Sequence, residues 1–101
     1  MSISERQHKL IQEAANLLVK DINLTTEEAV QVIADSLKKE LVKRAATMEA
    51  LDHSTKSDRT AFVRAVVHRL QLAIEENPYW KSKNMPKMIE QFYKIMHDSW
   101  E

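Results

Sequence analysis

Apolar positions spaced three and four residues apart recur along most of the chain, with polar positions between them. This spacing is typical of amphipathic helices that bury one face. The clearest stretch runs from Thr26 to Ala50, where no Gly or Pro interrupts the pattern, and Thr25 with Glu28 forms a capping box before it. We therefore predict one helix over residues 26–50, roughly 37 Å long at 1.5 Å per residue. Its expected buried face consists of Val30, Ile33, Ala34, Leu37, Leu41, Ala45, Met48 and Leu51.

Two more helices flank this long one. The first is predicted over about residues 4–21, and the short connection that follows it favours antiparallel neighbours. The other is expected to begin near Thr55 or Ser57 and to end at Asn77, because Pro78 disfavours helical geometry in the residue before it. Its expected core face consists of Phe62, Val63, Val66, Val67, Leu70, Ala73 and Ile74.

The last predicted helix brings most of the bulky side chains. Pro86 suits its first turn. Five of the six aromatic residues of the chain fall between Tyr79 and Trp100. The expected core face consists of Met88, Ile89, Phe92, Ile95, Met96 and Trp100. Four amphipathic helices with short connections predict an all-α fold, a compact four-helix bundle with a long central second helix, in a single domain over residues 1–101.

Composition argues against several kinds of chemistry. The 101 residues contain no Gly and no Cys, so Gly-rich phosphate loops, Gly-x-Ser-x-Gly elbows, disulfides and thiolate metal sites are excluded. No two of the four histidines stand four residues apart, so the two-histidine helical metal motif is missing as well. We expect a non-enzymatic protein with no catalytic residues, no metal and no cofactor.

The chain also lacks the sequence features of a membrane or secreted protein. Its first residues do not show the basic and then apolar pattern of a signal peptide, and no apolar run approaches the length of a membrane span. We therefore expect a cytoplasmic protein with no membrane partner.

Charge is balanced overall but unevenly distributed. The chain has 15 basic and 15 acidic side chains, yet residues 38–87 hold 11 basic and 6 acidic ones, a balance of +5. Arg44 lies inside the apolar face of the long predicted helix. In one alternative, the aliphatic part of the Arg44 side chain lies on apolar surface and its guanidinium reaches water. In the other, the guanidinium forms a partly buried ion pair with an acid on another helix. The sequence leaves both alternatives open.

The basic middle of the chain is a candidate nucleic-acid-binding segment, because clustered cations bind phosphates. The candidate residues over 38–87 are Lys38, Lys39, Lys43, Arg44, Arg64, His68, Arg69, Lys81 and Lys83. Cations on solvated helix faces are also ordinary, and the overall pI near 6.9 is low for such a protein.

Protein–protein association is the broader hypothesis. Apolar residues remain on the polar faces of two predicted helices, and the loop after Asn77 carries two aromatics of the kind that dominate interfaces. The candidate contact residues are Val32, Val42, Ala61, Ala65, Leu72, Tyr79 and Trp80. Trp80 is equally consistent with a lid over the end of the bundle. We predict a small helical protein-interaction module, a regulator, inhibitor or adaptor that binds another protein or itself as a homodimer, with nucleic-acid binding as the alternative.

Overall fold

The computed structural model describes residues 5–80 and 85–98, and over these residues the chain is entirely helical or irregular. The all-α prediction is confirmed. The helices are α1 (Glu5–Asp21), α2 (Thr26–Arg44), α3 (Met48–Asp52), α4 (Lys56–Glu76) and α5 (Met85–Asp98). In this part of the chain, no helix is both long and apolar enough to cross a membrane.

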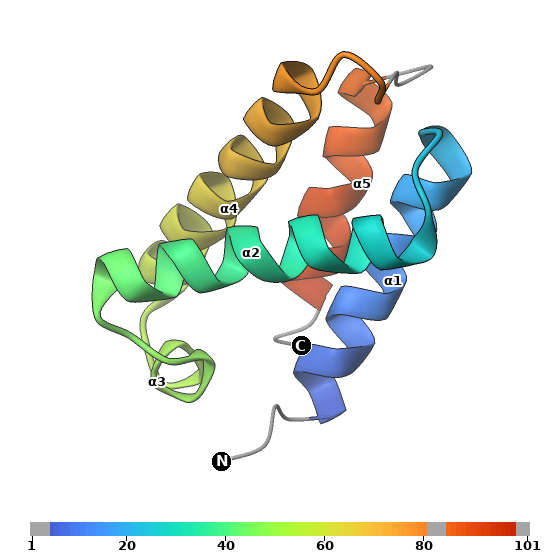
Figure 1. Cartoon of the computed structure of the whole chain (residues 1–101). Helices are drawn as coiled ribbons and strands as arrows, with labels where there is room; N and C mark the ends of the chain where they lie inside the picture. The colour runs from blue at the N-terminus through green and yellow to red at the C-terminus, as the bar shows by residue number, and fades with distance from the viewer. Residues whose placement is uncertain (1–4, 81–84, 99–101) are drawn as a thin grey trace.

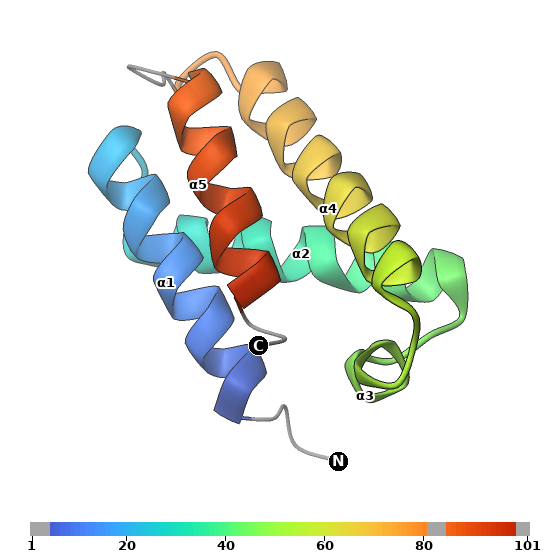
Figure 2. The same ribbon diagram turned by 180° about the vertical axis from the view of Figure 1, so that it is seen from behind.

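The four long helices form two layers. Figures 1 and 2 show α1, α5 and α4 side by side, with α5 in the middle, and α2 running across one face of this layer. The contacts agree, because α5 touches both α1 and α4 while α2 touches α1 and α4. The predicted four-helix bundle is not confirmed in this form, since α2 crosses its neighbours at a steep angle and a short fifth helix is present.

The second helix is shorter than predicted. It ends at Arg44, so the prediction of one helix over residues 26–50 is wrong. Ala45 adopts the left-handed conformation with φ of 50°, and its N–H donates to the carbonyl of Val42 at 3.1 Å. The N–H of Ala46 donates to the carbonyl of Leu41 at 3.0 Å, which completes a Schellman motif. The hydroxyl of Thr47 then caps the short helix α3.

The predicted starts of α2 and α4 are confirmed. The capping box of α2 is present: the amide of Glu28 donates to the Thr25 hydroxyl at 3.1 Å, and the amide of Thr25 donates to the Glu28 carboxylate at 2.8 Å. Thr55 caps α4 through the amide of Asp58. Asn77 ends α4 immediately before Pro78, as predicted.

The core lies between the two layers, and all four long helices contribute buried apolar side chains to it. The predicted face of α4 is buried except for Ala73, which is half-buried. Met88, Phe92 and Met96 are the buried residues of α5, whereas Ile89 and Ile95 are half-buried. Trp100 lies outside the described residues.

The buried face of α2 is rotated from the predicted one. Ile33 and Leu37 are buried as expected, but Val30, Ala34, Leu41 and Met48 are only half-buried, and Ala45 is exposed. Ala29, Ser36 and Glu40 are buried in their place. Because α2 lies across three helices, its contact face is set by the surface beneath it and includes two polar residues. The Ser36 hydroxyl is satisfied by donating to the Val32 carbonyl at 2.8 Å.

Candidate functional site

A buried carboxylate joins α2 to α4. Glu40 is only 2% exposed, and its two oxygens accept separate hydrogen bonds from two arginines. Nε of Arg44, one turn further along α2, donates to Oε2 at 2.7 Å, and Nε of Arg69 on α4 donates to Oε1 at 3.0 Å. Each oxygen of the carboxylate therefore has a charged partner, as a buried ion requires.

The arginines determine the ionisation of Glu40. Burial alone would raise the pKa of this carboxyl, because it penalises the charged form. The hydrogen bonds from Arg69 and Arg44, together with their positive charges, outweigh burial and hold the pKa of Glu40 below its ordinary value. Glu40 is thus an anion at neutral pH, and it fixes the position of one guanidinium from each helix.

Neither sequence-based alternative for Arg44 describes its contacts fully. Its side chain is 34% exposed, so its head reaches water as the first alternative required. It also forms an ion pair, but the acid lies on its own helix rather than on another one. The residue that bridges the helices is Arg69, which the sequence had indicated only as a phosphate-binding candidate. Glu40 stands one turn before Arg44 on the same face, and this spacing was the signal that was missed.

Beside this ion network, a groove of about 290 Å³ runs between α2 and α4. Its apolar lining includes Leu72, which is 42% exposed, and the half-buried Val32. The complete lining is Val32, Asp35, Ser36, Lys39, Arg69, Leu72, Ala73 and Glu76. We call this the α2–α4 groove. Three of these eight residues are apolar and four are charged, and the buried Ser36 is the remaining one.

The charges of the groove are separated along its length. Figure 1 shows that α4 begins beside the C-terminal end of α2 and rises away from it at a steep angle, so the two helices diverge beyond the contact between Glu40 and Arg69. Lys39 and Arg69 therefore lie toward the end marked by Glu40, which we call the basic end. Asp35 and Glu76 lie toward the other end, which we call the acidic end. The groove thus has a basic end and an acidic end, and on α4 the apolar residues Leu72 and Ala73 lie between Arg69 and Glu76.

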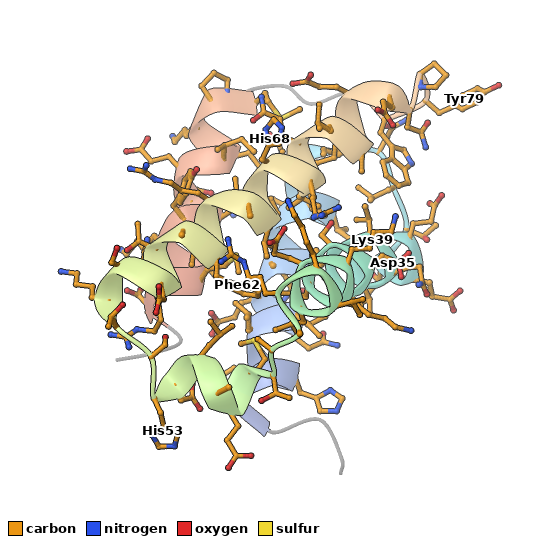
Figure 3. The ribbon with its side chains drawn as sticks, turned by 90° about the vertical axis from the view of Figure 1, so that its left-hand side faces the viewer. Asp35, Lys39, His53, Phe62, His68 and Tyr79 are labelled. Carbon is orange, nitrogen blue, oxygen red and sulfur yellow. The ribbon has the colours of Figure 1, made fainter. Side chains whose placement is uncertain are left out.

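The predicted protein-contact residues are not all brought together. Val32 and Leu72 meet in the groove. Val42 is 71% exposed on α2 and Tyr79 is 79% exposed beyond α4, but neither lines the groove. Figure 3 shows Tyr79 projecting from the end of the molecule.

The remaining contact candidates lie elsewhere. Ala61 lines a separate shallow hollow on α4 together with Arg64, and Ala65 is half-buried. Trp80 is half-buried against the core, which agrees with the lid alternative.

The predicted nucleic-acid-binding residues lie mainly on α2 and α4. Lys38, Lys39 and Lys43 are exposed on α2. His68 lies on the side of α4 that faces away from Lys39 (Figure 3), and Arg64 precedes it by one turn of the same helix. Arg44 and Arg69 are engaged with Glu40, and Lys81 and Lys83 lie outside the described residues. Of the described candidates, Lys39 and Arg69 lie together in the α2–α4 groove.

The structure and the comparisons add two further observations. Within the described ranges, no three His, Asp or Glu side chains stand close enough together to hold a metal ion. Comparison with protein-family models, with curated proteins and with solved structures finds no match to this chain. The assignment of function therefore depends on the geometry of the chain itself.

Proposed function

We propose that this chain is a small, non-enzymatic helical protein-interaction module, a cytoplasmic regulator, inhibitor or adaptor, that binds a polypeptide in the α2–α4 groove. One observation carries the proposal: Leu72 remains 42% exposed in a groove that also contains Val32 and is lined by four charged side chains. Interfaces are organised in this way, with an apolar centre that excludes water and a polar rim that sets orientation.

The ion network supports the proposal by fixing one basic side chain of the groove wall. Glu40 holds Arg69 of α4 against α2 directly beside the groove. A side chain that is fixed before binding loses less conformational entropy when a partner arrives, and so the groove binds more tightly for the same contacts.

The alternative, nucleic-acid binding through residues 38–87, has less support. Phosphate binding needs neighbouring cations that are free to release their counterions. Two of the nucleic-acid-binding candidates, Arg44 and Arg69, are paired with Glu40. The groove also contains as many acidic as basic side chains. Nucleic-acid binding would weaken steeply with salt and would depend on Lys38, Lys39, Lys43 and Arg64. Polypeptide binding in the groove would instead depend on Leu72.

Affinity capture from the native cell lysate tests the proposal, with the lysate treated with nuclease to remove nucleic-acid bridges. The baits are the wild-type chain, Leu72→Glu in the groove and Val42→Glu outside it. Both substitutions place a carboxylate at an exposed apolar position of a long helix, so they are matched. We expect the proteins retained by the wild type and by Val42→Glu to be lost with Leu72→Glu. Equal retention by all three baits would contradict the proposal.

A further inference from the structure

The charges of the α2–α4 groove are arranged so that a second copy of the groove would complement them. Its basic end carries Lys39 and Arg69, and its acidic end carries Asp35 and Glu76. A two-fold axis through the middle of the groove, lying in the interface and at right angles to the length of the groove, reverses the order of the two ends in the partner. Each basic end then faces the acidic end of the other copy, and the exposed Leu72 side chains of the two copies lie near the axis.

Two of these four charges lack partners within the described part of the chain. Arg69 is paired with Glu40, and Asp35 accepts a hydrogen bond from the Gln31 amide at 2.9 Å. Lys39 and Glu76 make no side-chain hydrogen bond or ion pair with any other described residue. Lys39 and Glu76 can therefore form ion pairs in a complex without breaking an existing contact.

From this arrangement we propose that the polypeptide bound in the α2–α4 groove is a second copy of this chain, in a two-fold symmetric dimer. The Lys39 ammonium of each copy pairs with the Glu76 carboxylate of the other, and Leu72 packs at the centre. A chain of zero net charge at pH 7 experiences no overall repulsion from its own copy. This proposal rests on the proposed function, and it names the partner.

The symmetry gives a test that only a second copy of this chain would pass. Lys39→Glu places an acid at both ends of the groove, and Glu76→Lys places a base at both ends. Each variant alone would therefore form two repulsive contacts in a homodimer. In a mixture of the two variants, the carboxylate introduced at position 39 of one copy faces the ammonium introduced at position 76 of the other. The native Glu76 of the first copy then faces the native Lys39 of the second, so both contacts are attractive.

Sedimentation equilibrium of the purified full-length chains measures the outcome, with circular dichroism as a check that each variant folds. We expect the wild type to dimerise at micromolar to sub-millimolar concentration, and each variant alone to dimerise roughly ten-fold more weakly or worse, since two rim contacts change sign. The equimolar mixture is expected to regain the wild-type affinity.

A wild-type chain that stays monomeric throughout this range would overturn the proposal, and so would a mixture no tighter than its components. If the chain is monomeric while Leu72→Glu still abolishes capture from the lysate, the second-copy inference fails and the proposed function stands. If Leu72→Glu also leaves capture unchanged, both fail.

Discussion

Nε of Arg69 on α4 donates a hydrogen bond of 3.0 Å to the buried carboxylate of Glu40 on α2, linking residues that are 29 positions apart in sequence. This contact does two things. It fixes the crossing of α2 over α4, and it holds one basic wall of the α2–α4 groove in place. The fold and the candidate site therefore depend on the same ion network.

Glu40→Gln tests the stabilising role of this network. The neutral amide offers one acceptor oxygen in place of two charged ones, so one guanidinium faces an amide donor. We expect the free energy of unfolding from urea denaturation to fall by about 2 kcal/mol, the usual scale for hydrogen bonds to charged groups. Glu13→Gln, at an exposed position of α1, is the control and should change stability by less than about 0.5 kcal/mol. Equal effects of the two substitutions would refute the role assigned to Glu40.

The pH dependence of stability follows from the lowered pKa of Glu40. A carboxyl whose pKa is lower in the folded state contributes its full stabilisation above its unfolded pKa of about 4.3 and loses it as the pH falls through the folded pKa. We expect the stability difference between the wild type and Glu40→Gln to be constant from pH 7 to about pH 5 and to shrink at lower pH. Urea titrations at several pH values measure this difference. A difference independent of pH down to about pH 3 would mean that the carboxylate does not act as described.

Ala45→Gly is expected to stabilise the protein. The left-handed conformation of Ala45 brings its Cβ close to a backbone oxygen, which costs about 1–2 kcal/mol and is absent for Gly. The greater freedom of Gly in the unfolded chain offsets part of this, leaving a gain of about 0.5–1 kcal/mol. Ala46→Gly is the matched control and should be neutral or destabilising, because Ala46 does not share the positive φ. Thermal denaturation that shows no gain for Ala45→Gly would count against the helix end described here.

Helix α5 is expected to be essential for cooperative folding. Phe92 is fully buried between the layers, and Phe92→Ala should cost about 3–5 kcal/mol. Lys94→Ala, at an exposed position of the same helix, should cost less than about 0.5 kcal/mol. For the same reason a chain ending at Lys87 should lose its cooperative thermal transition. A chain of that length that melts close to the intact protein would show that α5 is not part of the core.

The spacing of apolar residues in the sequence was sufficient to predict most of the helices and most of the core-facing residues of α4 and α5. The end of α2 was not predictable in the same way. Left-handed helix ends usually use Gly, and Ala45 gives no such signal. The buried face of α2 was misplaced for a related reason: burial of Ser36 and Glu40 depends on the helices that α2 crosses. Periodicity within one helix does not contain that information.

The candidate site was only half predictable. Val32 and Leu72 were recognisable as apolar residues on polar helix faces, and the structure brings them together. The arrangement of charges in the groove was not predicted, because the sequence placed Lys39 and Arg69 only among the residues of a basic segment. Only the packing of α4 beside α2 brings them into one groove with Asp35 and Glu76.

Amide chemical shifts of the isotopically labelled wild-type chain, followed by NMR from micromolar to millimolar concentration, test the central claim most directly. The claim is that the α2–α4 groove binds a second copy of the chain. We predict concentration-dependent shifts that concentrate at Val32, Lys39, Leu72 and Glu76, with the amides around Ala61 unchanged. Shifts that do not depend on concentration, or that cluster around Ala61, would contradict it.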